Sequence, residues 1–343
     1  MKKITALLLA LMMLAGILAG CGKPKDTGKA DKLKVVTTIF PEYDWVRAIL
    51  GDKAENAEVT MLLDNGVDLH SYQPTADDIV RISDCDLFVY VGGESDGWVE
   101  NALKNAANRN MRVINLLEVL GDSVKTEETV EGMQEDGHDH GHSHDEHDEE
   151  HDEEHDEAEG HDHGEEKDEH VWLSLKNAQV LCVTIADALC AIDPDNKNTY
   201  IANAAAYRDK LAALDADYKA AVDGATHKTV LFGDRFPFRY LVDDYGLNYY
   251  AAFVGCSAET EASFETVSFL AKKVDELGLP CVLTIEGAQH RIAETIVQNT
   301  AGKKQKVLTM DSMQSTTSKD VANGATYLSV MEKNLSVLKE ALG

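Results

Sequence analysis

Residues 33–50 read LKVVTTIFPEYDWVRAIL, and this stretch decides the fold class. Its first half, Lys34–Ile39, is rich in β-branched residues and predicts a strand. Its second half predicts a helix over Pro41–Leu50, because proline is favoured in the first turn of a helix. A strand followed at once by a helix is the start of a βαβ unit, and such units build parallel sheets.

The same alternation continues along the chain on both sides of an acidic insert. Before the insert, further strands are expected at 57–62, 87–91 and 112–115, and after it a second alternating set runs from 229 to 342. Between the two sets, residues 195–222 are rich in alanine and lack glycine and proline, which favours one long helix. We expect an α/β fold with two Rossmann-like lobes and mainly parallel sheets, joined by one long rigid helix, with a metal cleft between the lobes.

The expected organisation follows from these changes in composition. It comprises a signal peptide (1–20), a tether (21–32), an N-terminal α/β lobe (33–126), an acidic loop (127–169), the end of the N-terminal lobe with the linker helix (170–224), and a C-terminal α/β lobe (225–343).

The N-terminus predicts export. Lys2 and Lys3 precede an apolar run from Leu7 to Leu18 that is short for a membrane span. The run ends in LAGC, with Cys21 where a bacterial lipoprotein processing box places its lipidated cysteine. We therefore expect an extracytoplasmic protein, lipid-anchored to the bacterial cell membrane through Cys21; the alternative is an ordinary cleavable signal.

The negative charge is concentrated in the insert. The chain has 343 residues and a formal charge of −29, of which residues 127–169, with 22 Asp and Glu against one Lys, carry −21. The remaining −8 is ordinary for a protein long enough to form two lobes. Nothing here resembles the basic surface of a nucleic-acid-binding protein, so that class is excluded.

The insert also holds nine histidines among its carboxylates. Such a segment cannot bury a core and is expected to be disordered without metal, with several weak, exchangeable zinc sites. The alternative is a solvated acidic linker. The HExxH order of zinc proteases is absent. The secondary metal-binding histidines predicted here are His138, His140, His142, His144, His147, His151, His155, His161 and His163.

Five cysteines remain after Cys21, and an odd number cannot all pair within an exported chain. A bridge between Cys256 and Cys281 is one alternative, and buried free thiols are the other. No CxxC pair occurs, so the cysteines are not expected to form the metal site.

Two histidines outside the insert lie in loops. His70 occurs in LHSYQP, between a predicted strand and helix, and His170 occurs in DEHVWLSL, where the insert ends. Loops at the carboxyl ends of parallel strands are where α/β folds bind ligands.

These two segments resemble the "PHxYxP" and "DPHxWLSP" motifs of the zinc- and manganese-binding solute-binding lipoproteins of metal ABC transporters. VVTTIFPEYDWV is similar to the opening strand and helix of that family, and ATYLSVMEKNL to its closing helix. The resemblance covers nearly all of 33–343. It implies a monomeric, non-enzymatic protein that binds a divalent metal ion and delivers it to an ABC permease in the membrane.

The resemblance also implies ligands from the C-terminal lobe. The family motif "SHxAFxYLxxxYGL" corresponds to the segment around residues 233–247, where Asp234 takes the ligand position if counted from the strand and Arg235 if counted back from Phe238. Arginine cannot bind a cation, which favours Asp234. Asp311, at the end of a later strand, is the fourth expected ligand, and Glu286 is expected to organise the cleft.

The expected metal set is therefore His70, His170, Asp234 and Asp311, with Zn²⁺ as the metal. Two carboxylates are harder ligands than imidazole, so Mn²⁺ is the alternative on the same fold. A surface metal buffer or adhesin, with the histidine-rich loop as its functional part, is another. A metal-dependent hydrolase is disfavoured, because four protein ligands leave no open position for water.

Overall fold

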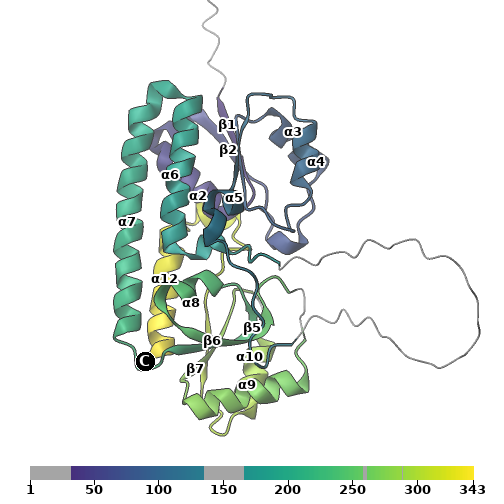
Figure 1. Cartoon of the computed structure of the whole chain (residues 1–343), viewed down its shortest axis with the longest axis vertical. Coiled ribbons are helices and arrows are strands. Elements are labelled where there is room, and N and C mark those ends of the chain that lie inside the picture. Colours follow the sequence, from purple (N-terminus) through teal and green to yellow (C-terminus); the bar gives the residue numbers. More distant parts are fainter. Residues whose placement is uncertain (1–31, 135–165, 258–260, 288) are drawn as a thin grey trace, which may run out of the picture. The chain divides into compact units, whose positions relative to one another are not determined.

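The computed structural model describes residues 32–134, 166–257, 261–287 and 289–343 (Figure 1). Residues 34–343 form one compact unit that contains two four-stranded sheets. The predicted signal peptide, Cys21 with its tether, and the nine histidines between 138 and 163 lie outside the described residues.

The N-terminal sheet has the strand order β2-β1-β3-β4, and β3 pairs in parallel with both β1 and β4. Its register aligns Val36 with Phe88, both buried, so apolar residues face the surrounding helices. The elements of this lobe are β1 (Leu33–Thr37), α2 (Phe40–Leu50), β2 (Ala57–Met61), α3 (Ala76–Asp84), β3 (Leu87–Tyr90), α4 (Val99–Lys104), β4 (Arg112–Asn115) and α5 (Leu116–Leu120).

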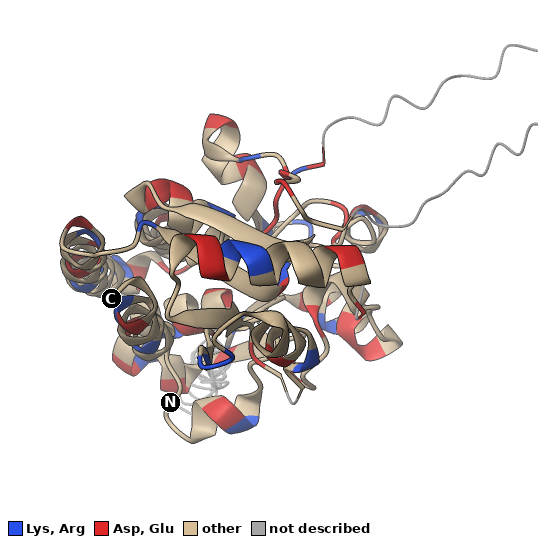
Figure 2. Cartoon of the chain, turned by 90° about the horizontal axis from the view of Figure 1, so that it is seen from below, with Lys and Arg blue, Asp and Glu red and all other residues tan. Residues whose placement is uncertain are grey.

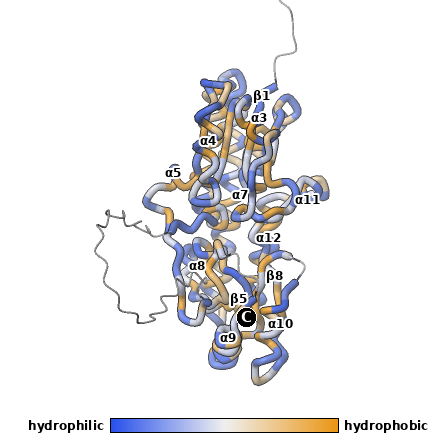
Figure 3. The backbone as a smooth tube through the Cα atoms, turned by 90° about the vertical axis from the view of Figure 1, so that its right-hand side faces the viewer, coloured by the Kyte–Doolittle hydropathy of each residue, from blue (hydrophilic) through white to orange (hydrophobic). Residues whose placement is uncertain are grey.

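The C-terminal sheet repeats this plan with the order β6-β5-β7-β8, all of whose neighbours pair in parallel. In both lobes the strands are mainly hydrophobic (Figure 3), as buried parallel strands are. The elements are β5 (Thr229–Phe236), α8 (Arg239–Tyr245), β6 (Asn248–Val254), α9 (Phe264–Leu277), β7 (Cys281–Thr284), α10 (Arg291–Asn299), β8 (Lys306–Thr309) and α11 (Ser318–Ala322). The predicted α/β class with two parallel-sheet lobes is confirmed.

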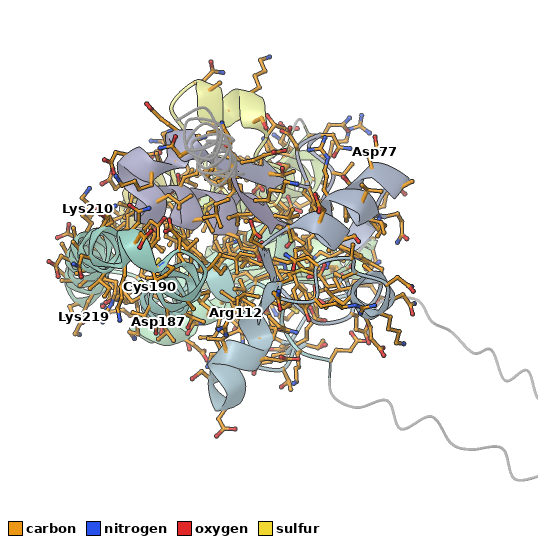
Figure 4. The ribbon with its side chains drawn as sticks, turned by 90° about the horizontal axis from the view of Figure 1, so that it is seen from above. Asp77, Arg112, Asp187, Cys190, Lys210 and Lys219 are labelled. Carbon is orange, nitrogen blue, oxygen red and sulfur yellow. The ribbon has the colours of Figure 1, made fainter. Side chains whose placement is uncertain are left out.

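Long helices run beside the sheets (Figure 1). α6 (Leu175–Ile192) is followed by α7 (Lys197–Asp223), the predicted long helix, and α12 (Tyr327–Leu342) closes the chain. The 27 residues of α7 span about 40 Å, enough to contact α2 and α6 in the N-terminal lobe and α8 and α12 in the C-terminal lobe. Its outer side is charged: Lys210 and Lys219 are exposed there (Figure 4).

Side-chain contacts join the lobes in addition to helix α7, the expected long helix. Tyr327 of α12 donates through its hydroxyl to the carbonyl of Trp172 at 2.6 Å, and its ring packs edge-on against Trp45 of α2. The indole of Trp172 in turn donates to the carbonyl of Ser312 at 2.8 Å. Large aromatic residues thus join segments that are far apart in the sequence.

The ends of the acidic insert are ordered, which moves the boundaries expected at 127 and 169. Thr126 and Lys167 form an antiparallel bridge, and the Glu127 amide donates to the Glu166 carbonyl at 2.8 Å. The Gln134 amide donates to the Ala252 carbonyl of β6 at 2.9 Å. Backbone pairing therefore overrides the acidic composition at both ends of the segment.

All five cysteines of the described residues are free thiols, so the Cys256–Cys281 bridge considered from the sequence is not formed. Acidic and basic residues are interspersed over the described helices (Figure 2). This agrees with the ordinary charge balance expected outside the insert.

Candidate metal centre

His70 is held in the loop between β2 and α3. It lies in a short 3₁₀ turn, Leu69–Ser71, where the Asp68 side chain caps the turn by accepting from the His70 amide at 3.0 Å. The imidazole Nδ1 lies 2.8 Å from Ser95 Oγ. The contact at Nδ1 leaves the other ring nitrogen, Nε2, directed toward His170.

His170 is completely buried where the chain returns from the insert. Asp168 Oδ1 accepts from both the amide of His170, at 2.9 Å, and its Nδ1, at 3.0 Å. A carboxylate acceptor keeps the proton on Nδ1 and leaves the lone pair on Nε2. Metal-binding histidines usually have a partner of this kind, because it orients the ring and makes the ligand nitrogen more basic.

The Nε2 atoms of His70 and His170 lie 3.2 Å apart, although the residues are separated by 100 positions in the chain. In a tetrahedral zinc site with Zn–N bonds of about 2.0–2.1 Å, two ligand nitrogens lie about 3.3 Å apart. The two histidines predicted from the sequence are therefore brought together at the spacing that one zinc ion requires.

The surroundings give the two imidazoles different pKa values. Burial, and then the neighbouring His170, lower the pKa of His70 to about 3, so its ring is neutral. Burial also acts to lower the pKa of His170, but the charge of Asp168 and its hydrogen bond outweigh it and raise that pKa. A neutral ring at His70 is ready to bind a cation, whereas His170 binds one in competition with its proton.

Glu169 adds negative charge beside the pair. Its side chain is almost fully buried, and Oε1 accepts from the Ser95 amide at 2.9 Å. Oε2 lies 3.5 Å from His70 Nδ1 and has no hydrogen-bond partner in the described structure. Burial raises the pKa of this carboxyl group.

Cys256 is the residue near the histidines that the sequence-based expectation excluded. Among the described residues, the cluster able to hold a metal ion is His70, His170 and Cys256, with one potential ligand atom of each within 4.8 Å of the others. The missed signal was its position two residues after Val254, just beyond the carboxyl end of β6, where parallel sheets place ligands.

Asp234 is not brought to the histidine pair. Its Oδ2 accepts from Thr284 Oγ1 at 2.6 Å and from the Ile285 amide at 3.4 Å, and its Oδ1 accepts from the Arg235 amide at 2.9 Å. Asp234 therefore connects β5 to the end of β7 within its own lobe.

Arg235, the other residue considered for that position, forms an ion pair with Asp68 across the cleft. The pairing of β5 with β6 shifts register between Phe232 and Arg235, which accounts for the ambiguity in counting from the strand. Burial acts to raise the pKa of Asp68, but the charge of Arg235 outweighs it and the pKa is lowered. The Arg235 guanidinium thus neutralises the Asp68 carboxylate next to His70.

Asp311 and Glu286 form a separate acidic pair. Glu286 accepts from the amide and the hydroxyl of Ser312, both at 2.7 Å, and from the Gln314 amide at 3.2 Å. Asp311 Oδ1 accepts from the Met313 amide at 2.8 Å. Burial raises the pKa of both carboxyl groups. Glu286 therefore orders the loop after β8, and Asp311 lies outside the cluster of the two histidines.

A cleft of about 820 Å³ opens beside the histidine pair. Asp68 and Ser71, which flank His70, line one wall, and Asp234, Arg235 and Ser257 line the other. The cleft gives solvent a route to the loops that carry the site.

The family model for ZnuA, the periplasmic zinc-uptake complex component A, matches residues 35–341. The zinc-binding lipoprotein AdcA of Streptococcus pneumoniae serotype 4 is 35% identical over 345 residues, covering 99% of this chain and 61% of that protein. The chain therefore spans less than two thirds of that relative's length.

Two further matches extend over nearly the full length of the compared chains. The high-affinity zinc uptake system protein ZnuA of Bacillus subtilis is 30% identical, covering 95% of this chain and 94% of that protein. The crystal structure of the Zn(II)-bound ZnuA-like domain of S. pneumoniae AdcA has a TM-score of 0.67 and 30% identity, covering 91% of this chain and 99% of that domain. These matches confirm the resemblance identified from the sequence motifs.

Proposed function

The chain belongs to the ZnuA family of zinc-uptake complex components, and on this premise we propose that it captures Zn²⁺ outside the cytoplasm and delivers it to an ABC permease in the membrane. The proposal is a binding role rather than catalysis. Two relatives that match most of this chain are a zinc-binding lipoprotein and a zinc uptake protein, which supports the choice of metal.

The observation that carries this proposal is the 3.2 Å separation of the Nε2 atoms of His70 and His170. Two imidazoles at this distance can share one ion, and neutral imidazole prefers zinc, copper or nickel to magnesium or calcium. The hydrogen bonds of the two rings with Ser95 and Asp168 hold them in place, so little conformational freedom is lost on binding.

The remaining parts of the function are proposals on the same basis. Lipidation at Cys21 would keep the protein at the outer side of the bacterial cell membrane, next to the permease, as a monomer. The nine loop histidines would concentrate metal near the cleft. Asp234 and Asp311 as further ligands remain a prediction from the family resemblance.

Manganese capture is the second candidate function. It would require hard oxygen ligands at the ion, and Asp234 and Asp311 would have to turn from their present hydrogen bonds to supply them. The described geometry favours zinc, because the two groups already facing each other are imidazoles.

A deletion of residues 135–165 tests the cleft assignment. The two ends, which are paired through Thr126 and Lys167, are kept and joined by a short flexible linker. We expect one tight zinc equivalent to survive the deletion in a competition titration with a chromophoric chelator. Adding His70→Ala and His170→Ala to the deletion should abolish it.

Loss of tight binding on deletion alone would move the main site into the loop and make the protein a metal buffer. If the cleft of the deletion variant prefers manganese to zinc, against the general order of metal affinities, the manganese function is correct.

A further inference from the structure

We propose that Cys256 is a metal ligand, so that the ion is bound by the two imidazoles and one thiolate sulfur. This inference rests on the proposed function, because it names a ligand of the same site, and it makes the site specific for soft, thiophilic divalent ions. It assigns a role to a residue that the sequence pattern had set aside.

The position of Cys256 in the fold supports this role. Cys256 follows β6, whose carboxyl end lies next to that of β5 in the C-terminal sheet. The preceding residue, Gly255, lies so close to His170 that an added Cβ would be 3.0 Å from the ring Cε1 and 3.1 Å from Nδ1. Such contacts are tighter than nearly all real Cβ contacts, so glycine favours this close approach of the loop to the imidazole, and the next side chain is that of Cys256.

The distances between the potential ligand atoms also support this role. The sulfur of Cys256 and one ring nitrogen of each histidine all lie within 4.8 Å of one another. With Zn–S bonds of about 2.3 Å and Zn–N bonds of about 2.0–2.1 Å, a tetrahedral site requires N–S separations of about 3.6 Å. The Nε2 atoms, 3.2 Å apart, already have the spacing of a bound pair, so small movements of the side chains complete the set.

The loop that carries Cys256 is anchored, and its thiol is not part of a disulfide. The Cys256 amide donates to Glu127 Oε1 at 3.0 Å, which ties the loop to the ordered start of the insert. No disulfide occupies the sulfur. When the thiol binds a metal ion as thiolate, its proton is released to solvent.

The charge of the ion and its surroundings also agrees with this ligand set. Two neutral imidazoles and one thiolate leave a bound Zn²⁺ with one uncompensated positive charge. Glu169 is buried beside His70, and its Oε2 has no hydrogen-bond partner among the described atoms. Its carboxylate supplies the missing negative charge at short range.

The other candidate residues of the C-terminal lobe interact with other groups. Both carboxylate oxygens of Asp234 accept hydrogen bonds within the C-terminal lobe. Arg235 is a cation paired with Asp68. Of Asp234, Arg235 and Cys256, it is Cys256 whose potential ligand atom lies in the cluster with the two histidines in the described structure.

A thiolate changes which metals the site accepts. Soft sulfur ligands favour zinc and disfavour manganese, which prefers carboxylate, carbonyl and water oxygens. The thiolate therefore accounts for zinc selectivity without a third histidine ligand.

The test uses the full chain under reducing conditions, with the metal ion itself as the probe. X-ray absorption at the zinc edge, with less than one equivalent of Zn²⁺ bound, should show one sulfur at about 2.3 Å together with nitrogen or oxygen at about 2.0–2.1 Å. Co²⁺ in place of zinc should give a thiolate-to-cobalt charge-transfer band. Residues 135–165 contain no cysteine, so the loop cannot contribute sulfur to either signal.

Cys256→Ser should remove the sulfur signal and weaken zinc binding at least about 100-fold, since even the partners behind metal ligands contribute 10–100-fold. Cys281→Ser is the matched control, because that thiol is free, lies in the same lobe and is outside the cluster. It should leave both readouts unchanged.

The outcomes separate the two proposals. A wild-type spectrum without sulfur overturns the role of Cys256, and this measurement holds even if Cys256→Ser fails to fold. If His170→Ala abolishes tight binding but Cys256→Ser does not, the zinc-binding function stands and the thiolate ligand is wrong. If neither substitution alters tight binding, the cleft is not the site and both proposals fail.

Discussion

The two halves of the proposed metal site are built differently. In the N-terminal half, His70 and His170 face each other and are each held by a hydrogen bond at Nδ1, from Ser95 and Asp168. In the C-terminal half, Asp234 bonds within its lobe, Arg235 pairs with Asp68, and Cys256 approaches from a different strand. The N-terminal half follows the family motif closely. In the C-terminal half, Arg235 is a cation next to the expected ligand Asp234, and the thiol of Cys256 lies near the histidines.

The proposed site keeps the preformed histidine pair of the family motif and differs in its other half. The buried histidine pair depends on packing within one lobe and on the return of the insert. The C-terminal loops only have to bring one further ligand across the cleft. The further ligand can come from the end of β5 or from the end of β6 without a change of fold, because the loops at the carboxyl ends of strands are not part of the core.

Asp168→Asn is expected to have the largest effect among the tests of this comparison. The amide can still accept from Nδ1 of His170, but without its negative charge the imidazole becomes a weaker ligand. We expect zinc affinity to fall about 10–100-fold, measured by chelator competition. Asp122→Asn, at an exposed position, is the control. Unchanged affinity would show that the preformed half does not depend on this carboxylate.

Asp234→Asn should have a smaller effect on zinc affinity, less than about tenfold, the low end for residues that do not bind the metal themselves. The asparagine keeps an oxygen to accept from Thr284, so the connection between β5 and β7 survives. A loss as large as that of His170→Ala would instead support the ligand set expected from the family motif. Asp311→Asn, measured in the same titration, distinguishes the fourth expected ligand in the same way.

Asp96→Asn should leave zinc affinity nearly unchanged but alter the pH dependence of stability. Burial, with the nearby Glu169 adding to it, raises the pKa of Asp96 to about 7 from its ordinary value of 3.8. Between these values the folded state binds a proton that the unfolded state does not. This group therefore stabilises the fold at low pH, and its contribution is lost as pH rises toward 7.

The measurement is urea unfolding of the metal-free protein at pH 5 and pH 7. One such group changes the free energy of unfolding by about 1.4 kcal/mol per pH unit over this range. The asparagine variant should show a pH dependence weaker by about that amount. Identical profiles for wild type and variant would mean that Asp96 is ionised in the folded protein at both pH values.

Much of the fold could be predicted because it depends on local patterns. The strand at 112–115 was predicted with the bounds that the structure has, since its β-branched residues are a local signal. The short helices α5 and α11 were not predicted, because five residues carry too little periodicity. The ordered ends of the insert depend on contacts with β6, which no local pattern encodes.

The amino-acid sequence by itself determined the two α/β lobes, the long helix and the candidate histidines His70 and His170, because each of these follows from a local pattern or a specific motif. Only the tertiary structure decided which groups meet. It directed Asp234 and Arg235 to other partners and brought Cys256 from the end of β6 to the two imidazoles. The physical reason is that a ligand set depends on where strand ends and loops converge in space, and one irregularity in β5 is enough to redirect the side chains that follow it.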